Sequence, residues 1–122
     1  MQVPTDDEFD KIISGALDSL PEKYTARMTN VAIVYADEPT SQQRQKLELR
    51  CDQTLLGLFE GVPLPARGGT VPILPDKITI FKVPLAQMSK NANELKENVR
   101  HTLWHEMAHY FGLNHKQIHE RE

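Results

Sequence analysis

One run of eleven residues constrains the fold of this chain more than any other feature. His105, Glu106 and His109 begin the pattern H-E-x-x-H-x-x-G-x-x-H, which continues through Gly112 to His115. Residues four positions apart lie on the same face of an α-helix, so the imidazoles of His105 and His109 can reach one metal ion. Gly112 accepts a positive φ, at which the helix can end and the chain turn back. The pattern therefore requires a helix that stops at Gly112 and a turn that delivers His115.

The residue types of this run favour zinc chemistry. We predict that His105, His109 and His115 hold Zn2+, which leaves the fourth tetrahedral position for water, as in catalytic zinc sites. Glu106 lies about 100° round the helix from His105, where it can reach that water and act as a catalytic general base. The predicted reaction is hydrolysis, with the metal-bound water attacking a carbonyl and Glu106 passing its proton to the leaving amine.

Two further histidines could bind metal on spacing alone. His101 lies one turn before His105, and His119 follows His115 at the same interval. Only the pair at 105 and 109 has the glutamate and the glycine turn beside it. We therefore interpret His101 as a partly exposed or supporting residue and His119 as part of a solvated tail.

Apolar periodicity predicts an α+β fold for the rest of the chain. Thr5 and Glu8 have capping-box spacing, and Pro84 ends the clearest β-branched run. In chain order we predict a helix over 5–20, strands over 31–36, 55–60 and 77–83, and a helix over 91–111. Residues 39–52 are expected to form a polar surface loop with one or two helical turns around 41–49, and residues 61–76 an irregular loop packed on the body of the protein.

Composition indicates one ordinary globular domain. The 122 residues are 39% hydrophobic and 25% charged, so we expect a single domain over 1–122. The net charge is −3 with Lys and Arg scattered, which argues against nucleic-acid binding. No long apolar run or basic leader is present, so we expect neither a membrane span nor a signal peptide. Cys51 has no intrachain partner, which fits a cytoplasmic protein.

Several runs along the chain, one of which includes most of the histidine motif, resemble a known family. They are Asp37-Glu38-Pro39, L-L-G-L-F-E-G-V-P-L at 55–64, L-P-D-K-I-T-I-F-K at 74–82 and V-R-H-T-L-W-H-E-M-A-H-Y-F-G at 99–112. Together they resemble the small bacterial zincin-like metallopeptidases, single domains that often have Asp where this chain has His115. The resemblance covers most of the chain from Val31 to Ile118. It implies a minimal zincin fold, in which a backing helix and an active-site helix pack on a small mixed sheet.

The extended motif also matches the metzincin peptidases, but one of their hallmarks is missing. The seven residues after His115 contain no methionine for the turn that metzincins carry there. We therefore expect a minimal zincin with an open cleft, which a partner or a second copy of the chain could complete.

Two functions follow from these patterns. The first is a zinc metallopeptidase that acts on a peptide or protein substrate, and more specifically an endopeptidase. Residues 77–83 are a candidate edge strand for that substrate, or equally an internal strand, and the loop at 61–69 with Arg67 could line the cleft. The alternative is a metal-stabilised protein-binding module without hydrolytic activity.

Overall fold

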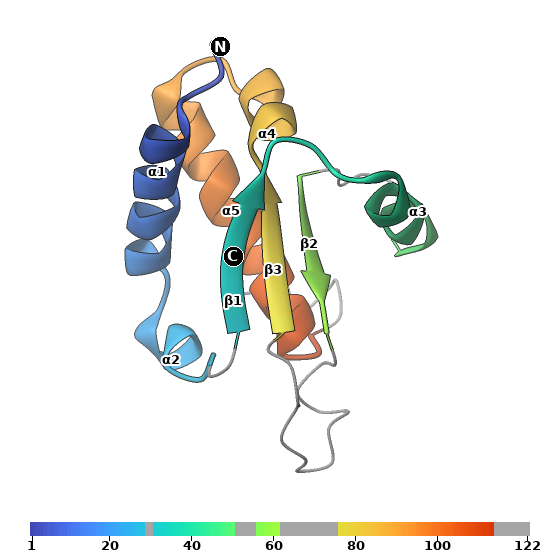
Figure 1. Cartoon of the computed structure of the whole chain (residues 1–122). Helices are drawn as coiled ribbons and strands as arrows, with labels where there is room; N and C mark the ends of the chain where they lie inside the picture. Colours follow the sequence, from blue (N-terminus) through green and yellow to red (C-terminus); the bar gives the residue numbers. More distant parts are fainter. Residues whose placement is uncertain (29–30, 51–55, 62–75, 114–122) are drawn as a thin grey trace.

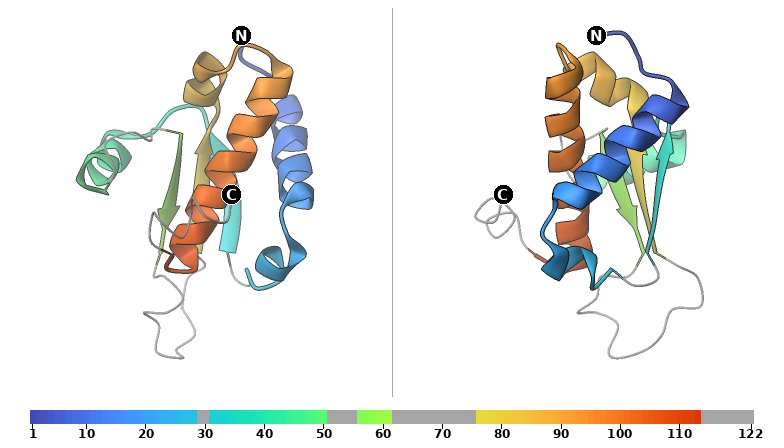
Figure 2. Two further views of the ribbon diagram at one scale, coloured as in Figure 1. Left: turned by 180° about the vertical axis from the view of Figure 1, so that it is seen from behind. Right: turned by 90° about the vertical axis from the view of Figure 1, so that its left-hand side faces the viewer.

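The fold is an α+β arrangement of five helices and three strands among the residues that the structure describes. The computed structural model describes residues 1–28, 31–50, 56–61 and 76–113. Its elements are α1 (Asp6–Ser19), α2 (Glu22–Thr25), β1 (Val31–Ala36), α3 (Ser41–Arg50), β2 (Gly57–Glu60), β3 (Asp76–Phe81), α4 (Lys82–Met88) and α5 (Ala92–Tyr110) (Figure 1). Helices α1 and α5 lie on the same side of the sheet (Figure 2). This confirms the predicted α+β class.

The three strands form a small mixed sheet in the order β1-β3-β2. Strand β1 is parallel to β3, with Ile33 opposite Ile78, and β2 is antiparallel to β3, with Phe59 also opposite Ile78. Strand β3 is therefore central, and the interpretation of residues 77–83 as an edge strand was wrong. The reason is visible in its burial, because every β3 residue except Lys77 is buried, as expected for a strand with neighbours on both sides.

Helix α1 follows the prediction closely. Thr5 is its N-cap, and the Thr5 hydroxyl accepts a hydrogen bond from the Glu8 N–H while the Glu8 carboxylate accepts one from the Thr5 N–H. The hydrogen bond from the Thr5 N–H, with a smaller contribution from the Thr5 side chain, holds the pKa of the Glu8 carboxyl below its usual value. The helix buries Phe9, Ile13 and Ala16, so its apolar stripe faces the core.

Helix α3 extends further than the one or two turns that we predicted. Its ten residues begin after Thr40, whose hydroxyl accepts from the Gln43 N–H while the Gln43 side chain accepts from the Thr40 N–H. This is a second capping box, with glutamine in place of glutamate. The T-x-x-Q spacing was a start signal that the polar composition of this segment obscured.

Helices α2 and α4 were not predicted. Pro84, which we predict to end a strand, is instead the third residue of α4, and α4 starts directly after β3. Proline is tolerated there because the N–H groups of the first helical turn have no intrahelical partner.

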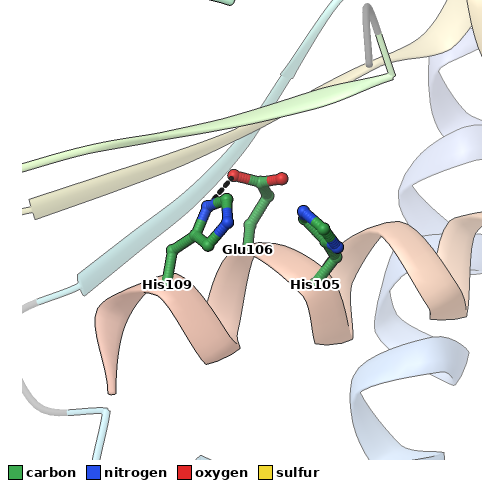
Figure 3. A group of neighbouring side chains, drawn as sticks. All are labelled: His105, Glu106 and His109. Atoms are coloured by element: carbon green, nitrogen blue, oxygen red, sulfur yellow. Dashed lines mark hydrogen bonds and ion pairs between the residues drawn. The ribbon is translucent and has the colours of Figure 1, made fainter. Parts of the chain in front are cut away.

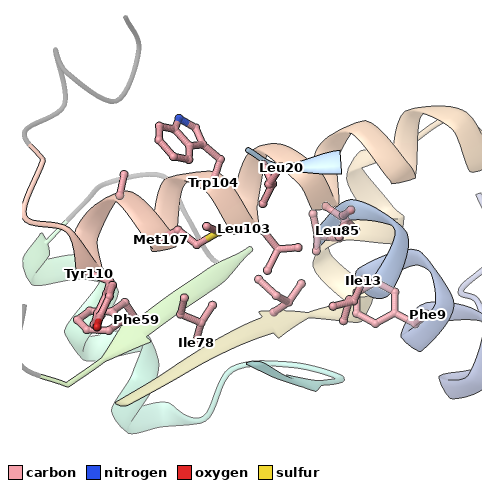
Figure 4. Packing of buried hydrophobic residues seen from close by; sticks show 14 of the residues in the cluster. Phe9, Ile13, Leu20, Phe59, Ile78, Leu85, Leu103, Trp104, Met107 and Tyr110 are labelled. Carbon is pink, nitrogen blue, oxygen red and sulfur yellow. The ribbon is translucent and has the colours of Figure 1, made fainter. Parts of the chain in front are cut away.

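Helix α5 forms the centre of the core. Asn91 caps it by accepting a hydrogen bond from the Glu94 N–H. Its predicted stripe is confirmed, since four of the five residues are fully buried and Phe111 is half-buried; the four are Leu95, Val99, Leu103 and Met107. Figure 4 shows Leu103 and Met107 above Ile78 of β3. The apolar face of α5 thus packs against α1 and α4 as well as against β2 and β3.

Candidate metal centre

Three side chains of types that can bind a metal meet on the face of α5 that turns toward β2. One ligand atom from each of His105, Glu106 and His109 lies within 4.8 Å of the others. The imidazole ring centroids of the two histidines are 4.6 Å apart. Both histidines are half-buried, whereas Glu106 is only 3% exposed. In Figure 3 the carboxylate lies between the two imidazoles, on the sheet side of the helix.

The Glu106 carboxylate is held by two hydrogen-bond partners. Its Oε1 accepts a hydrogen bond of 2.8 Å from the main-chain N–H of Phe59 in β2. The same oxygen lies 3.2 Å from Nδ1 of His109. When Nδ1 carries the proton and donates it to Glu106, the lone pair of the neutral ring is on Nε2, which is the form that binds a metal. Glu106 thereby orients a predicted ligand as well as standing beside the site.

The donor set fits zinc. Two imidazole nitrogens bound to one tetrahedral zinc ion at about 2.0–2.1 Å lie about 3.3 Å apart. Histidines at i and i+4 on an ordered helix, with donor atoms no more than 4.8 Å apart, can reach that separation through small side-chain rotations. Imidazole ligands suit zinc, whereas magnesium and calcium favour sites built from oxygen ligands.

The end of α5 has the turn that the third ligand requires. Gly112 has φ of 73°, as the motif predicted. The Gly112 N–H bonds to the carbonyl of His109, and the Leu113 N–H bonds to the carbonyl of Ala108. These two hydrogen bonds form a Schellman motif, which ends the helix and redirects the chain. His115, the predicted third ligand, lies outside the described residues, as do His119 and Arg67.

His101 stays apart from the metal-binding group. Its side chain is exposed, and the group on α5 consists of His105, Glu106 and His109 among the residues that the structure describes. This agrees with the interpretation of His101 as a residue outside the ligand set.

Sequence reasoning missed the partner of the catalytic candidate. A main-chain N–H carries no side-chain signal, so nothing in the letters at 57–60 points to the bond between Phe59 and Glu106. Gly57 is an indirect sign, since a glycine inside a strand is typical of a bulge or a close backbone approach. The structure has such a close approach, because a Cβ at Gly57 would lie 2.6 Å from Cγ2 of Thr102.

An H-E-x-x-H helix packed against a mixed sheet is the arrangement of a zinc peptidase. A model of the zincin-like metallopeptidase family matches residues 28–122, and the chain belongs to this family. No curated protein matched the sequence. None of the helices in the described part of the chain has the length and apolar character needed to cross a membrane.

Proposed function

We propose that this protein is a zinc-dependent endopeptidase in which His105, His109 and His115 hold the metal and Glu106 is the general base. The observation that carries the proposal is the convergence of two imidazoles and a buried carboxylate within 4.8 Å on one helix. Membership of the zincin-like metallopeptidase family supports it. The chemistry that zinc would supply there is polarisation of a carbonyl and acidification of water.

The arrangement gives the two oxygens of Glu106 separate roles. Oε1 is occupied by Phe59 and His109, so the proton taken from water would be held on Oε2. In Figure 3 this second oxygen lies on the side of His105. From Oε2 the proton can pass to the leaving amine without disturbing the two hydrogen bonds that fix the carboxylate.

The decisive experiment compares wild type with Glu106→Gln. Glutamine keeps an oxygen that accepts from Phe59 and His109, but it cannot take up a proton as a base. Zinc content is measured by elemental mass spectrometry, and cleavage is measured on an unfolded protein and a peptide library. We expect full zinc content and loss of cleavage by about a hundredfold or more in Glu106→Gln.

Glu106→Ala is the companion variant, because it removes both the general base and the hydrogen-bond acceptor of Phe59 and His109.

The cleavage products of the wild-type protein test the endopeptidase part of the proposal. Fragments released from inside the unfolded protein would support endopeptidase activity, whereas trimming from its ends would overturn that part of the proposal. A wild-type protein that binds zinc yet cleaves nothing with any metal or substrate would favour a metal-stabilised binding module instead.

A further inference from the structure

The edge strand β2 approaches α5 more closely than any side chain at position 57 would allow. A Cβ built on Gly57 lies 2.6 Å from Cγ2 of Thr102, 3.3 Å from the carbonyl oxygen of Thr79 and 3.4 Å from Cγ of Glu106. Contacts below 3.0 Å force a neighbour to move, because atoms in protein interiors are already close-packed. Gly57 is therefore required for space between strand and helix.

The neighbour that would have to move is itself fixed. Thr102 is buried, and its hydroxyl donates a hydrogen bond of 2.8 Å to the carbonyl of Asn98 one turn earlier in α5. That bond fixes the rotamer and directs Cγ2 toward β2. An alanine at Gly57 would therefore displace the strand from the helix more readily than it would displace Thr102.

The strand atoms that would move include the anchor of Glu106. The Leu56 carbonyl accepts a hydrogen bond from the Phe81 N–H, so in the antiparallel alternation the N–H of Phe59 lies on the other edge of β2. There it donates to Oε1 of Glu106. The Phe59 ring also packs against Tyr110 of α5, with ring centroids 5.9 Å apart. Phe59 therefore contacts α5 through its ring as well as through its main-chain N–H.

We propose that Gly57 is a positioning residue for the catalytic carboxylate of Glu106. Because position 57 has no side chain, β2 lies close enough to α5 for the Phe59 N–H to donate its hydrogen bond to Glu106. This inference rests on the proposed function of Glu106. The predicted ligands His105 and His109 both belong to α5, so a displaced β2 leaves their spacing unchanged. A substitution at Gly57 should therefore lower the rate of the chemical step while zinc binding is kept.

The test uses the zinc-loaded full chain with Gly57→Ala and the double variant Gly57→Ala/Thr102→Ser. Serine keeps the hydroxyl that bonds to Asn98 and removes only Cγ2, the atom that the new methyl group would meet. We expect Gly57→Ala to lower kcat by about a hundredfold, as for a displacement of about 1 Å at a catalytic group, with KM and zinc content nearly unchanged. The double variant should recover most of the lost kcat.

The matched control is Gly15→Ala in α1, where a Cβ meets nothing within 4 Å. It should leave kcat unchanged. Loss of kcat in Gly57→Ala that Thr102→Ser does not recover, or a parallel loss of zinc and KM, would overturn the proposal, and so would an unchanged kcat.

The amide resonance of Phe59 gives a readout that does not depend on activity. In Gly57→Ala its proton should shift upfield and exchange faster with solvent, because the hydrogen bond to Glu106 lengthens, and Thr102→Ser should restore it. If the wild-type protein cleaves nothing, the proposed function fails. The Phe59 amide still shows whether Gly57 is needed for the hydrogen bond that holds Glu106.

A second variant covers the case in which Gly57→Ala does not fold. Glu106→Asp shortens the side chain from the helix side, and the Phe59 amide should show the same upfield shift. An unchanged amide in Glu106→Asp would overturn the proposal.

Discussion

The ammonium group of Lys82 lies 3.2 Å from Oδ1 of Asp37 and also forms a hydrogen-bonded ion pair with Asp6. The lysine side chain is only 9% exposed, whereas both aspartates are largely exposed. One cation therefore links the start of α1, the segment after β1 and the start of α4. The hydrogen bond that Lys82 donates to Asp6 is the main reason why the pKa of Lys82 is raised above its usual 10.5.

We expect Lys82→Met to lower the urea midpoint of unfolding at neutral pH. Because the folded-state pKa of Lys82 is raised, the stabilising effect is fully present below pH 10.5 and is lost as the pH rises through the folded-state value. The difference in urea midpoint between wild type and Lys82→Met should therefore narrow as the pH rises above 10.5. Lys77→Met is the control, since Lys77 is half exposed and lies 3.7 Å from Glu60. A gap that persists at alkaline pH would contradict this account.

Gly15→Ala should stabilise the protein by about 1 kcal/mol. Glycine in a helix interior is about that much less favourable than alanine, and the added methyl group meets no neighbour. Gly61→Ala should have the opposite sign, because Gly61 has φ of 153° and its Cβ would collide with the side chain of Asp76. Chemical denaturation of both variants checks the two signs, and a destabilised Gly15→Ala would show that this helix face is not open.

Thr5→Ala should cost about 1 kcal/mol of stability, since the hydroxyl that caps α1 is lost. The pKa of Glu8 should rise only part of the way toward 4.5, because the side-chain hydrogen bond of Thr5 is lost while the main-chain N–H at position 5, the larger cause of the lowering, can still donate to the carboxylate. Thr25→Ala is a comparison variant in which an exposed hydroxyl bonds to a carbonyl within α2 and caps nothing. NMR titration of Glu8 alongside urea unfolding measures both effects, and equal losses in the two variants would argue against the cap.

Leu103→Ala should destabilise the fold by about 2–5 kcal/mol, because the side chain is fully buried between α5 and the sheet. Met88→Ala, at a side chain 54% exposed, should change stability by less than about 0.5 kcal/mol. Thermal and chemical unfolding distinguish the two, and a small effect at Leu103 would mean that the core can close around the cavity.

Zinc should raise the melting temperature, and chelation should lower it again. A ligand that binds only the folded state at about a hundred times its Kd stabilises by about 2.7 kcal/mol. His105→Ala and His109→Ala should lose most of this shift, whereas His101→Ala should keep it, since His101 is exposed and outside the group. A wild-type melting temperature that changes with neither zinc nor chelator would contradict a metal centre on α5.

Local rules account for what was predicted well. The Thr5 capping box, the buried stripe from Leu95 to Met107 and the positive φ of Gly112 each depend on residues within a few positions of one another. The i, i+4 spacing likewise brought His105 and His109 together, because helix geometry fixes neighbours along one face. The Thr40 box of α3 obeys the same rule and was readable, although its polar surroundings concealed it.

The sequence by itself determined the helix of the candidate metal centre, the residue types on its face and the α+β class. Only the tertiary structure decided that β3 is central, that β2 lies against α5 and that the N–H of Phe59 holds Glu106. The physical reason is that helix contacts are set by spacing along the chain, whereas strand order and main-chain donors to distant side chains depend on packing between segments. Residues 59 and 106 meet because Gly57 leaves room for that packing.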